Sequence, residues 1–241
     1  MATISLCMIV KNESAVLARC LDSIADLMDE IIIVDTGSTD NTKEIAAQYT
    51  SRIYDFKWTS DFSAARNFSF SKATMEYIYT ADADEILDDA NRERFLRLKG
   101  ALLPEIEIVQ MKYVTQGTFD TVLNAKKEYR PKLFRRLRTF TWIDPIHETV
   151  RLTPVTFDSD VEILHCPQSL HSKRDFSIFI KAFEHDGQFS PKIRTMYAKE
   201  LLKTGDKKDF TDAKPIFQLI FDNDPADDAR KEAACVLARI Y

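Results

Sequence analysis

Two carboxylates are separated by a single residue in the segment Asp82-Ala83-Asp84, directly after the apolar run Tyr77–Thr80. In an extended chain, residues i and i+2 point to the same side, so both carboxylates would face one point beyond the strand. Like charges that close are unfavourable unless a cation or a proton lies between them. Carboxylate oxygens suit Mg²⁺ and Mn²⁺, so the segment predicts a divalent-cation site. The alternative is an acidic turn before a helix that Asp88 or Asp89 caps.

A further acidic residue, Asp35, directly follows the β-branched run Ile31–Val34. An Asp just past a buried strand can accept hydrogen bonds from a nucleotide base or a ribose. Gly37 permits a tight turn and residues 38–41 can begin a helix, so ordinary turn and cap chemistry explains those residues. That chemistry does not require an Asp at the tip of a buried strand, which makes Asp35 a candidate nucleotide ligand.

A basic segment could supply the positive charge that an anionic ligand needs. The usual interpretation of such a charge run is a solvated strand or loop. The functional interpretation is that the run neutralises a diphosphate or holds an acidic acceptor. Its five cations have no acidic residue between them and are Arg130, Lys132, Arg135, Arg136 and Arg138.

These candidate residues need strands that bring their carboxyl ends together. No proline occurs before Pro104, so strands and helices can alternate without interruption up to that point. Strands that alternate with helices predict a mostly parallel α/β sheet covered by helices. Ligands of such sheets bind outside the carboxyl ends of the strands. The predicted strands are Ile4–Val10, Ile31–Val34, Arg52–Phe56 and Tyr77–Thr80, and the predicted helices begin after Ser14, begin after Asp40 or Asn41, and span Phe62–Ala73.

The second part of the chain has a different pattern. Shorter apolar runs between prolines predict further strands, and the pattern becomes helical from Leu170 onward. The last helices resemble a tetratricopeptide helix pair, so we expect a domain over residues 1–168 and a helical tail over residues 169–241. Isolated pairs bury their faces poorly, so we expect the natural chain to continue past Tyr241. The later predicted strands are Ile106–Val114, Lys132–Arg135, Glu148–Arg151 and Val161–His165.

The composition disfavours several classes of protein. The 241 residues are 45% hydrophobic and 29% charged, as is ordinary for a globular protein. The sequence has no apolar run long enough to predict a transmembrane segment, and its net charge of −5 disfavours nucleic acid as a partner. The five glycines form neither the dinucleotide fingerprint nor the Walker loop. Four cysteines without a C-x-x-C pair, and an N-terminus without signal-peptide features, predict a cytoplasmic protein with reduced thiols.

Several segments of the sequence occur together in a recognisable order. They are Leu6–Glu13, Ile33–Thr42, Phe62–Asn67 and Asp82–Glu85, followed by Lys132–Arg136, Ile146–Glu148 and Ile163–His165. The first four resemble successive motifs of family 2 glycosyltransferases, which have the GT-A fold, and the last three resemble the distal blocks of that family. The most similar subgroup carries C-terminal tetratricopeptide repeats and includes peptide glycosyltransferases.

The resemblance implies a role for each matching residue. Asp35 matches the residue that binds the uracil ring, and Glu13 matches one near the nucleoside. Asp84 and Asp82 match the metal-binding D-x-D motif, with Asp84 the more direct ligand. His165 matches a late histidine that completes the metal site, and an imidazole among carboxylates favours Mn²⁺ over Mg²⁺. The other implied positions of the nucleotide-sugar site are Val10, Arg66, Asn67, Ala83 and Arg135.

The catalytic base is expected in the segment His147-Glu148. Enzymes of this family that invert configuration place a carboxylate near the acceptor, most often as Glu-Asp or Asp-Asp, and this sequence departs from those pairs. Glu148 is the first choice for the base, and His147 could orient it or contact the donor. The alternative for Glu148 is a strand-edge ion pair with Arg151.

These observations predict a metal-dependent inverting transfer of sugar from a UDP-sugar to an acceptor hydroxyl or thiol. The expected acceptor is a carbohydrate, a lipid-linked glycan or a peptide, and the tail could bind a protein partner. The alternative is a non-catalytic nucleotide-sugar-binding protein that uses its helical tail to recruit a partner. A nucleotidyltransferase is a third interpretation, which Lys11-Asn12-Glu13 disfavours because that chemistry usually needs a glycine-rich basic loop after the first strand.

Overall fold

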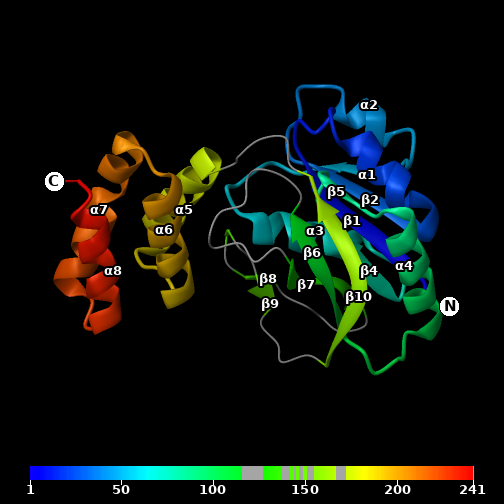
Figure 1. Cartoon of the computed structure of the whole chain (residues 1–241). Helices are drawn as coiled ribbons and strands as arrows, with labels where there is room; N and C mark the ends of the chain where they lie inside the picture. The colour runs from blue at the N-terminus through cyan, green and yellow to red at the C-terminus, as the bar shows by residue number, and fades with distance from the viewer. Residues whose placement is uncertain are drawn as a thin grey trace. The chain divides into compact units, whose positions relative to one another are not determined.

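A computed structural model describes residues 1–115, 127–136, 142–143, 145–146, 149–150, 155–166 and 172–240. The chain divides into two compact units, an α/β unit and a mainly helical unit (Figure 1). Two short segments far from the tail in sequence group with the tail helices. The α/β unit comprises Met1–Trp58, Ala64–Trp142 and Val150–Gln168, and the helical unit comprises Thr59–Ser63, Ile143–Thr149 and Ser169–Tyr241.

One half of the main sheet consists of parallel strands. β1 pairs in parallel with β2 on one side and with β4 on the other, and β2 pairs in parallel with β3. Residues Ile32–Val34 of β2 are fully buried, as expected for a parallel strand covered on both faces. The predicted alternation of four strands with three helices is confirmed. The strands are β1 (Ile4–Val10), β2 (Glu30–Asp35), β3 (Ile53–Asp55) and β4 (Tyr77–Thr80).

The other half of the sheet contains the antiparallel pairings. β7 is antiparallel to both β4 and β6, whereas β10 is parallel to β6 and antiparallel to β5. The strand order is β3-β2-β1-β4-β7-β6-β10-β5, and β8 and β9 form a separate two-stranded sheet. The prediction of a mostly parallel sheet therefore applies best to its first half. The strands are β5 (Glu85–Ile86), β6 (Ile108–Thr115), β7 (Lys127–Arg135), β8 (Trp142–Ile143), β9 (Thr149–Val150) and β10 (Thr156–His165).

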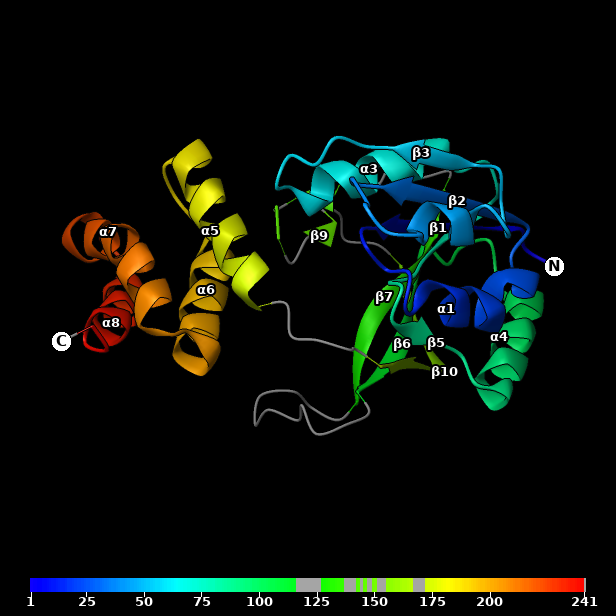
Figure 2. The ribbon, with the colours of Figure 1, turned by 90° about the horizontal axis from the view of Figure 1, so that it is seen from above.

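Helices cover both faces of this sheet. Successive residues of β1 point to opposite sides, so its side chains pack against helices on both faces. Leu6 and Met8 lie in the core with α1 and α4, whereas Cys7 lies in the core with α3. Figure 2 shows α3 on one face of the sheet and α1 and α4 on the other. These elements are α1 (Leu17–Ile24), η1 (Ala25–Leu27), α2 (Thr42–Ala46), α3 (Phe62–Lys72) and α4 (Asp89–Ala101).

The first helix begins later than the sequence predicted. α1 starts at Leu17, Val16 occupies the N-cap position, and no side chain caps the helix. The Ser14 N–H instead donates a hydrogen bond to Asp40 Oδ2 at 3.1 Å. The loop after β1 therefore binds the loop after β2, and that contact replaces the predicted capping role of Ser14.

The helical tail is confirmed and packs around the ring of Tyr197. This ring stacks on Phe179 with centroids 4.7 Å apart and meets Phe217 at 5.3 Å. Pro191 and Pro225 are 34 residues apart, which is the period of a tetratricopeptide repeat. Among the described residues, no helix is both long and apolar enough to cross a membrane. The tail helices are α5 (Ser172–Asp186), α6 (Pro191–Thr204), α7 (Lys207–Asn223) and α8 (Asp227–Leu237).

Candidate active site

The acidic loop after β4 contacts the end of β10. The Nε2 atom of His165 lies 3.0 Å from Oδ2 of Asp84, and both side chains are mostly shielded from solvent. The Cys166 N–H donates to the Asp84 carbonyl oxygen at 3.0 Å, which ties the backbone of the same two segments together. Asp88 caps α4 by accepting the Asn91 N–H, which confirms the predicted cap and leaves Asp82 and Asp84 outside it. The two predicted metal ligands Asp84 and His165 are therefore in contact.

A buried ion pair lies next to this loop. Glu85 follows Asp84 in the chain and pairs with Lys132 of β7, and both residues are buried. Glu85 is also the strand partner of His165 in the β5–β10 pairing. Burial raises the pKa of Glu85, and Lys132 opposes that shift. The pair thus fixes the loop to the middle of the sheet, and Glu85 was not among the predicted site residues.

Several cations act electrostatically on the carboxylate of Asp82. Desolvation by the surrounding protein raises the pKa of Asp82. The charges of Lys132, Arg66 and Arg130 outweigh that effect and hold this pKa below its ordinary value. Asp82 is therefore ionised at neutral pH and can act as an oxygen ligand. Its backbone carbonyl accepts a weak hydrogen bond from the Cys20 thiol at 3.5 Å.

Asp35 lies at the carboxyl end of β2 with only 1% of its surface exposed. Its Oδ1 atom accepts the N–H groups of Gly37 and Ser38, each at 2.9 Å. Its Oδ2 atom is buried and has no hydrogen-bond partner among the described residues. Since buried carboxylate oxygens normally have partners, Oδ2 is suited to accept a hydrogen bond from a ligand. Gly37 has a φ of 105°, a conformation that other residues rarely adopt, so the turn that supplies one of these N–H groups depends on glycine.

The loops after β1 and β2 are joined by hydrogen bonds. The Asn12 N–H donates to Ser38 Oγ at 2.9 Å, and Asn12 Oδ1 accepts the Thr39 N–H at 2.8 Å. The Glu13 N–H donates to Thr42 Oγ1 at 2.8 Å. Asn12 has a φ of 56°, which asparagine tolerates better than most residues. The predicted site residue Glu13 is thus held beside the turn that follows Asp35.

Two further predicted residues lie in buried strand ends or loops. Val10 ends β1 with 2% of its surface exposed, and its carbonyl oxygen accepts the Thr36 N–H at 3.0 Å. Ala83 is also buried, between the two acidic residues of the loop. Their side chains therefore pack against protein, and a ligand would meet them through the backbone.

Arg66 and Asn67 both contact Trp142 of β8. The guanidinium of Arg66 lies 4.9 Å from the centroid of the indole ring. The Asn67 side chain accepts the Trp142 N–H at 2.9 Å and donates to its carbonyl oxygen at 3.1 Å. Asn67 therefore holds β8 in place, a role that its position at the start of a helix did not predict.

The basic segment is divided between the two ends of β7. Because β7 is antiparallel to β4, Arg135 pairs with Tyr77 at the amino end of β4, away from the acidic loop. Arg136 donates to the Met75 carbonyl oxygen at the same edge. Arg135, a predicted residue of the nucleotide-sugar site, therefore lies at the far end of β4 from the acidic loop. Arg138 lies outside the described residues, as do His147 and Glu148.

The donor set fits a divalent cation that is shared with a ligand. Among the described residues, no three Asp, Glu, His or Cys side chains converge as a complete metal site. Asp84 and His165 supply one carboxylate and one imidazole, with Asp82 two residues away. Mg²⁺ and similar ions are often held by one or two carboxylates together with the phosphates of a substrate. A carboxylate and an imidazole of this kind suit Mn²⁺ or Mg²⁺.

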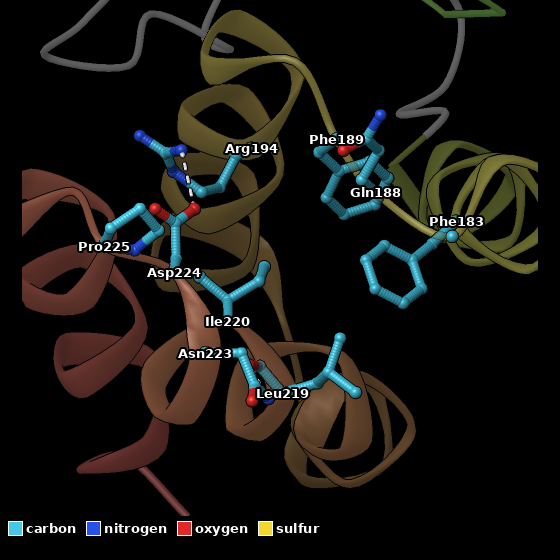
Figure 3. A pocket seen from close by; sticks show the side chains of 10 residues that line it. Phe183, Gln188, Phe189, Arg194, Leu219, Ile220, Asn223, Asp224 and Pro225 are labelled. Atoms are coloured by element: carbon cyan, nitrogen blue, oxygen red, sulfur yellow. Dashed lines mark hydrogen bonds and ion pairs between the residues drawn. The ribbon is translucent and has the colours of Figure 1, made fainter.

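A separate cavity of about 400 Å³ lies within the helical unit. Figure 3 shows Phe183, Phe189 and Leu219 along its wall, and an ion pair between Arg194 and Asp224 beside it. The two charged groups of that pair are 3.7 Å apart. None of the predicted site residues lines this cavity. It is distinct in composition from the acidic loop, because its lining is mainly aromatic, aliphatic and amide.

Comparisons with known proteins agree with the geometry. A TPR repeat-containing protein of Synechococcus elongatus is 48% identical to this chain over 87 residues, which are 36% of this chain and 22% of that protein. The SPbeta prophage-derived glycosyltransferase SunS of Bacillus subtilis is 33% identical over 132 residues, which are 53% of this chain and 31% of that protein. The chain therefore matches less than a third of the length of either relative.

A solved structure confirms the GT-A fold. It is glucosyl-3-phosphoglycerate synthase from Mycobacterium tuberculosis in complex with Mn²⁺, UDP-glucose and phosphoglyceric acid. The likeness has a TM-score of 0.55 at 19% identity and covers 79% of this chain and 82% of that one. The family model described as glycosyl transferase family 2 matches residues 5–153, which is more than half of the chain. The motifs, the fold and this match together show that the chain belongs to glycosyltransferase family 2.

Proposed function

We propose that the chain transfers a sugar from a UDP-sugar to an acceptor, with a divalent cation held by Asp84, Asp82 and His165. The observation that carries this proposal is the 3.0 Å contact between Asp84 and His165. It joins residues from two distant parts of the sequence at the carboxyl end of the sheet, where α/β folds bind their ligands. The Mn²⁺ and UDP-glucose in the M. tuberculosis synthase support this choice of ligands.

The chain's own residues would hold the donor from both ends. Asp35 would accept a hydrogen bond from the uracil ring through its unpartnered Oδ2 atom. Arg130, Lys132 and Arg66 place positive charge around the acidic loop, which would favour a diphosphate beside it. A bound Mn²⁺ or Mg²⁺ would stabilise the charge that develops on the departing UDP. Val10, Glu13 and Ala83 would line the donor site.

The acceptor side of the proposal rests on His147 and Glu148. Glu148 would remove the proton from an acceptor hydroxyl or thiol, and His147 would orient it. Attack in line with the departing diphosphate would invert configuration at the anomeric carbon. Positioning of donor and acceptor would supply much of the rate. We propose a carbohydrate, a lipid-linked glycan or a peptide as the acceptor, with the tail as the surface for a protein partner.

Donor hydrolysis tests this proposal without knowledge of the acceptor. UDP release from UDP-glucose, UDP-galactose and UDP-N-acetylglucosamine is measured with Mn²⁺ or with a chelator. We expect Mn²⁺-dependent release in the wild-type chain and a loss of roughly 10³-fold in Asp84→Asn, since a metal ion contributes several kcal/mol to charge stabilisation.

The matched control is Asp160→Asn, an identical change at an exposed residue of β10. It should leave UDP release unchanged. Equal rates in Asp84→Asn and wild type, or equal rates with chelator and with Mn²⁺, would contradict the metal role. Tight UDP-sugar binding with no release for any donor would favour the non-catalytic binding protein.

A further inference from the structure

The ring of Tyr113 contacts both a cation and the predicted metal-binding histidine. The guanidinium carbon of Arg130 lies 3.7 Å from the centroid of the Tyr113 ring. The Tyr113 and His165 rings lie 4.9 Å apart with their planes tilted by 34°. His165 in turn reaches Asp84 through Nε2. Four residues from separate segments therefore form one continuous chain of contacts that ends at the acidic loop.

The sheet register explains why these residues meet. Tyr113 of β6 pairs with Ile163 of β10, so His165, two residues further along β10, is its diagonal neighbour on the same face. Tyr113 is only 4% exposed, and its position is therefore set by core packing. Arg130 is itself held by a hydrogen bond from its Nε atom to Glu128 at 2.5 Å. Tyr113 is thus a fixed surface against which the imidazole rests.

A fixed ring matters because a histidine ligand must present one nitrogen in one direction. The imidazole can rotate about its side-chain bonds, and the outer contacts of a metal-binding histidine usually fix its orientation. An aromatic contact of this kind adds an attraction between the two rings beyond that of burial alone. Among the residues that the structure describes, the hydrogen bond of the His165 ring is the one from Nε2, and none involves Nδ1. The Tyr113 ring is therefore the contact best placed to orient this side chain.

We propose that Tyr113, fixed by core packing with Arg130 against its ring, is a positioning residue that directs Nε2 of His165 toward Asp84 and so prearranges the site for a divalent cation and a diphosphate. This inference rests on the proposed function. It adds a residue of β6 that acts through His165. Substituting Tyr113 should therefore change affinity only while His165 is present.

The test is a double-mutant cycle read by calorimetric titration of UDP in the presence of Mn²⁺. Tyr113→Leu removes the ring and Tyr113→Phe keeps it as the matched control. We expect Tyr113→Leu to weaken binding at least tenfold, as loss of an outer contact of a metal ligand typically does, and Tyr113→Phe to stay within about twofold of wild type. In a His165→Ala background, Tyr113→Leu should have no further effect.

A second variant and a fold control keep the test decisive. Tyr113→Met fills the core with a flexible side chain and should weaken binding as Tyr113→Leu does, with the thermal midpoint recorded for each variant. Wild-type affinity in both ringless variants would overturn the positioning role alone. An equal loss with and without His165 would also overturn it, since that result indicates a general packing effect. No Mn²⁺-dependent UDP binding in the wild-type chain would overturn the proposed function and this inference together.

Discussion

Two buried charged residues, one in each unit, are satisfied in different ways. Arg194 of the helical unit is 8% exposed and reaches two carboxylates, Glu232 at 2.9 Å and Asp224 at 3.7 Å. Asp35 of the α/β unit is 1% exposed, and its Oδ2 atom has no hydrogen-bond partner among the described residues. Two carboxylates compensate the first charge, whereas Asp35, with Lys43 Nζ 4.0 Å from its Oδ1 atom, keeps an unused acceptor in Oδ2.

The difference separates a structural charge from a candidate binding group. A buried polar atom without a hydrogen-bond partner lowers the free energy of unfolding by about 1–3 kcal/mol. Such an atom is therefore expected where it has a function, for example in binding a ligand. The helical unit places its charged pairs where they tie α6, α7 and α8 together. The α/β unit places carboxylates at strand ends, where a ligand can bind to their oxygen atoms. A substitution of Arg194 should therefore lower stability without changing UDP affinity, and a substitution of Asp35 should lower UDP affinity with little change in stability.

Arg194→Ala should give the largest effect on stability. It leaves Glu232 and Asp224 without their shared cation, and both are only partly exposed. Removing one partner of a buried pair costs about 3–5 kcal/mol, and solvent access to these carboxylates reduces that to about 2–3 kcal/mol. Hydrogen exchange of α6, α7 and α8 measures the change as faster exchange. UDP affinity should stay unchanged, and a tenfold loss of affinity would contradict a purely structural role for Arg194.

Asp35→Asn should have the converse signature. The amide retains one oxygen for the Gly37 and Ser38 N–H groups but replaces the free acceptor with a donor. We expect UDP affinity to fall by about tenfold, which is about 1.4 kcal/mol, with little loss of thermal stability. Calorimetric titration of UDP measures the affinity. Asp55→Asn, on the neighbouring strand and largely exposed, is the matched control. Unchanged affinity in Asp35→Asn would show that its free oxygen has no role in nucleotide binding.

The smallest expected effect distinguishes the two ends of β7. Arg130→Ala should weaken Mn²⁺-dependent UDP binding by about threefold, because an exposed charge contributes at most about 1 kcal/mol. Arg135→Ala, the same change at the other end of the strand, should have no effect. Repeating the titration at higher salt should reduce the difference, since salt screens exposed charges. A larger loss in Arg135→Ala than in Arg130→Ala would contradict the placement of the donor at the acidic loop.

Much of the fold could be predicted from local patterns. The β-branched run at Ile31–Val34 and the apolar run at Ile4–Val10 specify buried strands, and both occur close to the predicted bounds. The start of α1 could not be predicted in the same way, because Ser14 is used in a contact with Asp40 rather than as a cap. A preference for a cap is local, whereas the contact that replaces it depends on two loops meeting in space.

The candidate site was also predictable only in part, because contacts between distant segments cannot be read from local patterns. Asp84 and His165 were identified from motifs, and their contact is observed. The sequence could not show which cations of the basic segment lie near the acidic loop. Strand direction shows this, because it places Arg130 and Arg135 at opposite ends of β7. Tyr113 carries no motif at all. Its contact with His165 depends on the register between β6 and β10.

The most direct test of the central claim is the effect of Mn²⁺ on the ring signals of His165 in the NMR spectrum of a histidine-labelled chain. Paramagnetic Mn²⁺ broadens nuclei close to it. With UDP present, we expect substoichiometric Mn²⁺ to broaden the His165 signals and the ³¹P signals of UDP together, and Asp84→Asn to abolish both effects. Sharp His165 signals at saturating UDP and Mn²⁺, or UDP binding that a chelator leaves unchanged, would contradict it.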